Sequence, residues 1–192
     1  MIPFPDEYQA KALATWYKPD DPLYRDPRHP LIKLTGEAGE LLDLFGKNEY
    51  KPGFDWWQCK HCLKSKAGHI GSLICYHDRQ LEYTPLVLDE LGDWWYYYRV
   101  VSFIYGRPIS TLRTENYYHL STDKLLALMA QNSAVMLNDW LDFERIDGSR
   151  LRVLWGCFYP LAGQLETTVD QLTDLNYRKL NSEPTAHGWR AK

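Results

Sequence analysis

The chain has 192 residues, 45% of them hydrophobic, which is long enough for a globular domain with a buried core. Its formal net charge of −3 at pH 7 argues against a general affinity for nucleic acid or for anionic membranes, so we expect neither as a partner. No apolar stretch approaches the roughly 20 residues that span a bilayer, and the N-terminal residues lack a signal-peptide pattern, which indicates a cytoplasmic protein.

The spacing of apolar residues predicts an all-α fold in a single domain, because helical periods recur along the chain and strand patterns are weak. Helices are expected at residues 6–17, 30–46, 84–105, 122–142, 149–166 and 168–181. The remaining segments are expected to be a proline-rich connector at 18–30, a long polar insertion at 46–83 and a C-terminal tail at 183–192.

Two pairs of acidic residues stand out within these helical segments. Glu37 and Glu40 lie in GEAGEL, and Glu90 and Asp93 lie in DELGDW, each pair with the i,i+3 spacing that places both carboxylates on one helix face. A helical projection places the second pair on the apolar side of its helix, where ionised carboxylates are costly without a compensating cation. Acidic pairs more often mark a solvated face, but two pairs together favour a site for divalent metal and, through it, for a polyphosphate.

The sequence also suggests a duplicated helical unit, with a first copy at 6–120, interrupted by 46–83, and a degenerate second copy at 121–182. Both copies would end in the same pattern, formed by Ile109, Leu112, Asn116, Tyr117 and Leu120 and by Val169, Leu172, Asn176, Tyr177 and Leu180. In this overlay the four acidic positions are occupied in the second copy by Asn132, Val135, Leu154 and Cys157. One catalytic centre per chain is therefore expected, unless two similar helical hairpins align by chance.

The polar insertion carries a second possible metal site, formed by Cys59, Cys62, Cys75 and His77. A C-x-x-C pair places two thiolates on one turn, and a second Cys/His pair can complete a tetrahedral shell for a structural Zn²⁺. His61 or His69 is an alternative fourth ligand, and free thiols or a disulfide are alternatives to zinc. The remaining cysteine, Cys157, lies in an apolar segment and is expected in the core.

The acidic motifs and their flanks resemble the MazG-like, all-α nucleoside triphosphate pyrophosphohydrolases, whose signature is an E-x-x-E helix followed by an E-x-x-D helix. The resemblance extends to an N-terminal Glu-Tyr-Gln, to the approach segment PRHPLIKLTGE and to the closing Asn176-x-x-Lys179-Leu180, and covers about residues 6–46, 84–120 and 168–181. This chain departs from the family in its insertion, which separates Glu37 from Glu90 by 53 residues, and in Glu183, which stands where a basic residue is common.

The resemblance implies hydrolysis of a nucleoside triphosphate between its α- and β-phosphates, giving a monophosphate and pyrophosphate. It implies that Glu37, Glu40, Glu90 and Asp93 hold Mg²⁺ or Mn²⁺, with Glu40 the first candidate to orient the attacking water. Expected substrate contacts are Asn176, Lys179, Asn116 and Trp94, although packing is an equal alternative for the tryptophan. It further implies a homo-oligomer, a dimer or tetramer, in a bacterial or phage-infected cytoplasm, with a degenerate second repeat like that of the dimeric dUTPases.

Two other functions stay open at the level of sequence. The insertion carries local positive charge that suits a non-enzymatic module for nucleic acid or protein, from Lys51, Lys60, Lys64, Lys66 and Arg79. Another pyrophosphate-linked nucleotide is also a possible substrate, as in the related phosphoribosyl-ATP pyrophosphohydrolases. The overall acidic balance and the intact acidic motifs argue against the binding module.

Overall fold

A computed structural model describes residues 5–50, 84–112 and 117–182. The expected all-α fold is confirmed, since the described residues form helices and turns and contain no strand. The α-helices are α1 (Glu7–Leu13), α2 (Arg28–Tyr50), α5 (Thr84–Ile104), α6 (Thr122–Phe143), α7 (Gly148–Gln164) and α8 (Val169–Ser182). Two 3-10 turns, at Pro22–Arg25 and Ile109–Thr111, lie in the connections.

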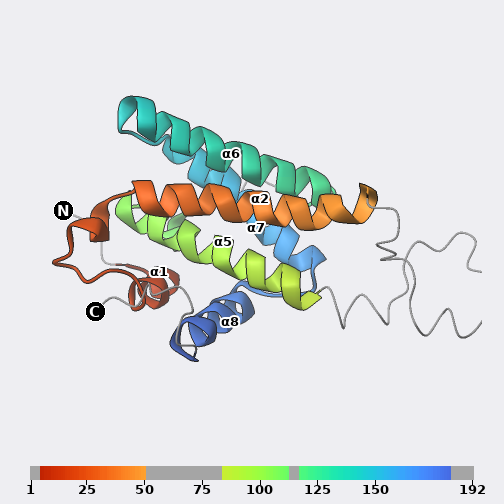
Figure 1. The fold of residues 1–192 in the computed structure, drawn as a ribbon, viewed down its shortest axis with the longest axis horizontal. Helices are drawn as coiled ribbons and strands as arrows, with labels where there is room; N and C mark the ends of the chain where they lie inside the picture. The colour runs from red at the N-terminus through yellow and green to blue at the C-terminus, as the bar shows by residue number, and fades with distance from the viewer. Residues whose placement is uncertain (1–4, 51–83, 113–116, 183–192) are drawn as a thin grey trace, which may run out of the picture.

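The long helices pack side by side as a bundle. Helix α2 lies between α5 and α6, and α7 packs against α6 (Figure 1). The two shorter helices, α1 and α8, both pack on α5 and also touch each other. None of the described helices is both long and apolar enough to cross a membrane. Helix α5 therefore contacts α2, α1 and α8, and it holds one of the two acidic pairs.

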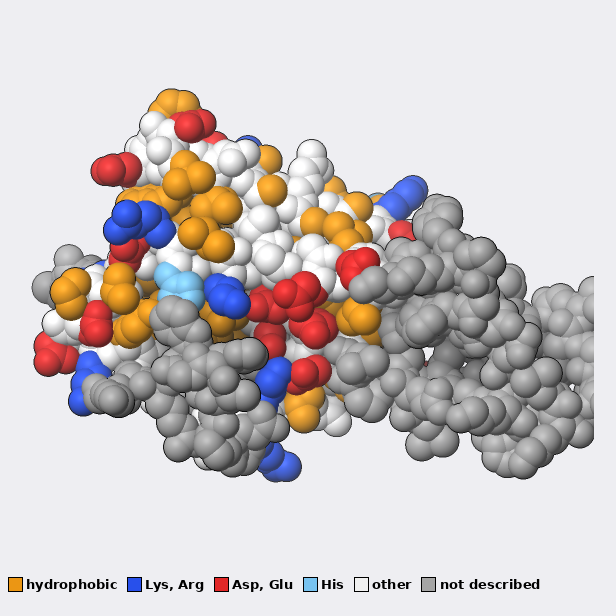
Figure 2. Space-filling view, viewed as in Figure 1, with side chains coloured by type: hydrophobic (Ala, Val, Ile, Leu, Met, Phe, Trp, Pro, Cys, Tyr) orange, Lys and Arg blue, Asp and Glu red, His pale blue; other side chains and the backbone are white. Residues whose placement is uncertain are grey.

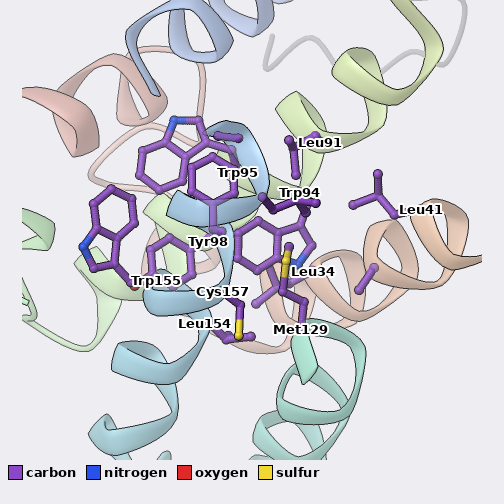
Figure 3. Close-up of a cluster of buried hydrophobic side chains, with 14 of the residues drawn as sticks. Leu34, Leu41, Leu91, Trp94, Trp95, Tyr98, Met129, Leu154, Trp155 and Cys157 are labelled. Carbon is purple, nitrogen blue, oxygen red and sulfur yellow. The ribbon is translucent and has the colours of Figure 1, made fainter. Parts of the chain in front are cut away.

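A stack of aromatic rings fills the core between α5 and α7. The rings of Trp95 and Phe158 lie 4.6 Å apart between centroids, and those of Trp94 and Tyr98 lie 5.3 Å apart. Trp94, Trp95 and Tyr98 lie close together in this cluster (Figure 3). Trp94 has no exposed surface, so the ring that was a candidate for a base pocket serves packing in this fold. Much of the heavy aromatic content of the chain is thus explained by the core.

Helix α1 ends at Leu13, four residues before the expected end at 17, because the chain tightens there into i→i−3 hydrogen bonds. This turn carries Trp16 into a second cluster with Tyr96 and Val100 on α5. At its other end, the side chain of Asp6 accepts from the Gln9 amide and the Gln9 side chain accepts from the Asp6 amide, which forms a capping box.

Buried polar side chains attach α1 to α5. The side-chain amide of Gln9, in the Glu-Tyr-Gln segment, donates to Ser102 Oγ at 2.9 Å and to the Arg107 carbonyl at 3.0 Å. The Arg99 guanidinium donates to the Tyr8 carbonyl at 3.1 Å and lies over the Trp95 ring. Burial lowers the pKa of Arg99 to about 10, which still leaves the guanidinium charged at neutral pH. The motif residue Gln9 therefore has a structural role.

The positions that replace the acids in the proposed second copy lie in the bundle. Leu154 and Cys157 are completely buried in α7, as expected for scaffold. Asn132 is buried on α6, where its side-chain oxygen accepts from Arg150 at 3.3 Å. The duplication itself stays a prediction, because similar packing would follow from any helical hairpin with these apolar residues.

Truncating the aromatic stack should be far more costly than truncating its exposed neighbour. Phe158→Ala removes a fully buried ring and should lower the free energy of unfolding by about 3–5 kcal/mol. Tyr159→Ala, one residue along α7 and 46% exposed, should cost about 1 kcal/mol or less. Urea unfolding followed by circular dichroism measures both, and equal losses would contradict this assignment of the core.

Candidate metal centre

Three of the four predicted acids converge at the seam between α2 and α5. Glu37 and Glu40 from α2 and Glu90 from α5 each bring one carboxylate oxygen into a group whose members all lie within 4.8 Å of one another. Such a group can hold a metal ion. Acidic side chains gather into a patch on this face of the molecule, with basic side chains beside it (Figure 2).

The local sequence explains how these carboxylates come to lie at a seam. On α2 the buried residues Leu34, Ala38 and Leu41 face the core, and Glu37 shares their side of the helix with only 7% of its surface exposed. Glu40 lies further round and is exposed. On the outer side, a Cβ added at Gly36 or Gly39 would meet no atom of the described residues within 4 Å, and both glycines are exposed.

Burial and the neighbouring negative charges disfavour the charged forms of Glu37 and Glu90. Burial, followed by the charges of Asp93 and Glu40, raises the pKa of Glu37 to about 8. Burial and the charge of Glu40 likewise raise the pKa of Glu90 to about 7, and a hydrogen bond between these two side chains adds to the effect. The group thus carries more negative charge than its surroundings compensate. A divalent cation with carboxylate ligands, such as Mg²⁺ or Mn²⁺, fits this donor set.

Asp93 lies next to the three glutamates but has different partners. Its Oδ1 accepts from the side-chain amide of Asn176 at 2.7 Å, and its Oδ2 accepts from the Lys179 ammonium at 2.9 Å. Lys179 also donates to Asp89 at 2.8 Å. Burial raises the pKa of Asp93, and the Lys179 and Asn176 contacts offset part of that rise. Asp93 therefore connects the acidic group to α8.

The two predicted substrate contacts on α8 are thus brought to the acids. Asn176 is almost completely buried, and the Lys179 side chain is 33% exposed. Burial lowers the pKa of Lys179, but its bonds to Asp89 and Asp93 outweigh this, and the ammonium stays charged. Sequence reasoning missed Asp89, although its i,i+4 spacing to Asp93 would have placed both on one face.

A further feature missed from the sequence is an aromatic cluster that borders Glu37. The rings of Trp16 and His29 stack with centroids 5.4 Å apart, and the Tyr17 hydroxyl lies 3.2 Å from His29 Nδ1. Tyr97, on α5, lies 6.3 Å from His29 between ring centroids, and the nearby charge of Glu37 adds to the burial that raises its pKa. His29 belongs to the PRHP segment, and this is the part of the sequence that could have indicated the cluster.

Several predicted site residues lie outside the described residues, and their roles stay predictions. These are Asn116 and the proposed zinc ligands Cys59, Cys62, Cys75 and His77.

Divalent metal should stabilise the fold, because it compensates carboxylates that repel one another. The melting temperature should rise between a chelator and millimolar MgCl₂ or MnCl₂, and the rise should be lost in Glu90→Gln. Differential scanning fluorimetry measures this, and an equal rise in both proteins would show that metal acts elsewhere.

Without metal, Glu37 should make stability depend on pH. Its folded pKa of about 8 lies above its unfolded value of 4.5, so its contribution is fully present below pH 4.5 and is lost as the pH rises to about 8. Glu37→Gln keeps a neutral side chain, so its melting temperature relative to wild type should increase from pH 5 to pH 9 in chelator. A difference that stays constant with pH would contradict the assigned burial.

Comparisons with protein-family models, with curated proteins and with solved structures give no match to this chain. What the protein does is therefore inferred from the residues of the site.

Proposed function

We propose that the protein hydrolyses a nucleoside or deoxynucleoside triphosphate between the α- and β-phosphates, giving a monophosphate and pyrophosphate. The observation that carries the proposal is the convergence of Glu37, Glu40 and Glu90 within 4.8 Å, with the charged Lys179 on the neighbouring carboxylate Asp93. Negative ligands for a divalent cation and a positive side chain for an anion are the two requirements of a polyphosphate site.

Each side chain has a role that follows from its position. Glu37 and Glu90, the more buried members, would hold Mg²⁺ together with Glu40. The bound ion would neutralise phosphate oxygens and stabilise the charge that develops on them. Glu40 is exposed at the outer edge of the group, where a carboxylate can orient a water molecule toward the α-phosphorus. Lys179 would contact the departing pyrophosphate as a point charge.

The aromatic cluster supports a nucleotide as the substrate. Tyr97 of α5 lies near enough to Glu37 to feel its charge, and it contacts His29 of α2 and Trp16 of the α1–α2 connection. Aromatic faces stack on bases with little sequence preference. A triphosphate at the acids would place its base in reach of such a surface. The cluster does not select one base, so the substrate is proposed only at the level of a nucleoside triphosphate.

A product assay tests the proposal directly. The protein should convert at least one of the eight common NTPs and dNTPs, with MgCl₂, to monophosphate and pyrophosphate, resolved by ion-exchange chromatography. Glu37→Gln and Glu90→Gln should each lower kcat/KM by about 10²–10³-fold, because each removes a ligand charge that stabilises the transition state.

The control is Asp142→Asn, which removes an exposed carboxylate at the far end of α6 and should leave the rate unchanged. Release of diphosphate and phosphate would refute the assigned bond. A complete lack of turnover with the full panel would refute the proposed activity on triphosphates.

A further inference from the structure

Exposed apolar side chains gather where the end of α6 lies beside the start of α2. Leu141 and Phe143, in the last turn of α6, are 62% and 61% exposed, the largest values among the large hydrophobic residues that the structure describes. Ile32, in the second turn of α2, is 56% exposed. Figure 2 shows hydrophobic side chains gathered over this part of the molecule, with charged side chains at their edge. A contiguous apolar patch marks a surface that another molecule covers.

A groove of about 570 Å³ lies directly beside these side chains. Pro22 and Pro27 line it on the side of the 3-10 turn and the start of α2, and Trp140 and Leu141 line it on the side of α6. Phe143 is two residues beyond Leu141, at the last position of α6. The groove therefore has apolar walls and room for an aromatic side chain, and an exposed aromatic ring lies next to it.

The two sides of the groove carry opposite net charge. Residues 22–28 include two arginines and one aspartate, and Arg28 pairs with that aspartate at 2.6 Å, which leaves the charge of Arg25. Residues 141–145 include two acids and one arginine, and that arginine lies over the Phe143 ring, 5.3 Å from its centroid. Arg25 and both acids are exposed. The end of α6 is thus negative, and the wall across the groove is positive.

These features make the face complementary to itself. In a two-fold symmetric dimer both copies use the same surface, so the ring and the groove of one copy meet the groove and the ring of the other. The negative end of α6 in each copy then meets the positive wall of the other copy. A foreign partner with a single sign of charge would be repelled by one of the two sides. A second copy of this chain therefore fits the face.

We propose that the protein forms a two-fold symmetric dimer through this face, with Phe143 of each copy seated in the groove of the other. The exposed leucine and phenylalanine supply the apolar contact, and the opposite charges set the orientation of the two copies. The inference goes beyond the proposed function and does not depend on it, because Glu37, Glu40 and Glu90 all belong to one chain.

Size-exclusion chromatography with multi-angle light scattering tests the dimer. The wild-type protein, 22.6 kDa per chain, should show twice that mass at micromolar concentration. Leu141→Arg should raise the dissociation constant at least about tenfold and give the monomer mass, because it places a charge in the apolar contact. Phe143→Ser removes the ring without adding charge and should give the same result. A monomeric wild-type protein would overturn the inference and leave the face to a different partner.

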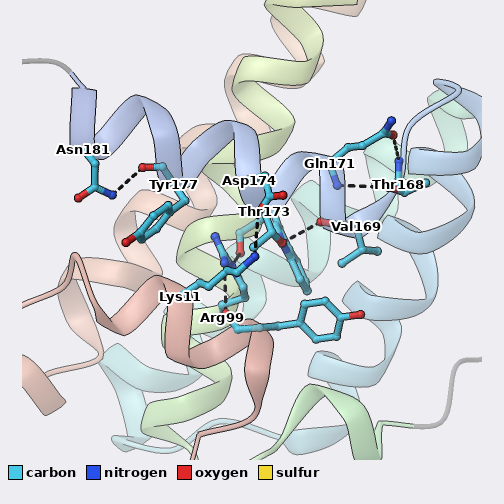
Figure 4. A network of polar contacts seen from close by, with 11 residues as sticks. Lys11, Arg99, Thr168, Val169, Gln171, Thr173, Asp174, Tyr177 and Asn181 are labelled. Atoms are coloured by element: carbon cyan, nitrogen blue, oxygen red, sulfur yellow. Dashed lines mark hydrogen bonds and ion pairs between the residues drawn. The ribbon is translucent and has the colours of Figure 1, made fainter.

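Leu175→Arg is the matched control, because it adds the same charge at an exposed leucine elsewhere. Leu175 is 43% exposed on α8, directly after Asp174, whose ion pair with Lys11 at 2.7 Å joins α8 to α1 (Figure 4). This variant should stay dimeric, and every variant should keep the helical circular dichroism spectrum of the wild type, since the replaced side chains are exposed. If Leu175→Arg dissociates as far as Leu141→Arg, or if neither dissociates, the face is wrongly assigned.

Charge reversal tests the reciprocal arrangement of the two copies. Arg25→Glu makes both the wall and the end of α6 negative, and Asp142→Arg makes both positive, so each variant alone should self-associate at least about tenfold more weakly. In an equimolar mixture the negative variant meets the positive one at both contacts, and the dimer should return. A mixture that is as monomeric as its two components would overturn the proposed arrangement.

Discussion

Acidic side chains are buried at the seam between α2 and α5. Glu37 is nearly as buried as the leucines around it, and Glu90 and Asp93 come from a helix whose other face carries the aromatic core. Such groups are costly unless a cation or strong donors compensate them. Lys179 and Asn176 offset part of the rise that burial causes in the pKa of Asp93, whereas the pKa of Glu37 is raised to about 8 and that of Glu90 to about 7. The three glutamates therefore form a group that could hold a metal ion, and Asp93 beside them is bonded to α8.

Much of the fold follows from the sequence because its helices are long and strongly periodic. Four of the six described α-helices agree with the expected ranges within two residues. Helix α2 continues four residues beyond its expected end, and α1 ends four residues early because the chain turns to bury Trp16. Periodicity is a local signal, and it does not report a turn whose cause is a contact with a distant helix. For the same reason it gave no indication that Gln9 would bond to the far end of α5.

In the candidate site, too, local features could be predicted from the sequence and tertiary contacts could not. The i,i+3 spacing placed each acidic pair on one helix face, and the apolar surroundings indicated that the pairs would be partly buried. Spacing alone could not distinguish Asp93 from the glutamates, because that difference comes from α8, which is distant in sequence. Nor could composition show that Trp94 packs in the main core whereas Trp16 packs with His29 and Tyr97 in a second cluster. Tertiary packing decides both.

The acids lie well inside their helices, with Glu37 more than three turns before the end of α2 at Tyr50 and Glu90 more than a turn after the start of α5 at Thr84. Their separation in space is set by helix packing, and the number of residues that join the two helices does not enter it. Because the entropy of closing a loop grows only slowly with its length, this connection is a place where sequence can be gained, lost or exchanged at little cost. A search for related proteins that fixes the distance between the two acidic motifs would therefore overlook chains with the same arrangement of carboxylates.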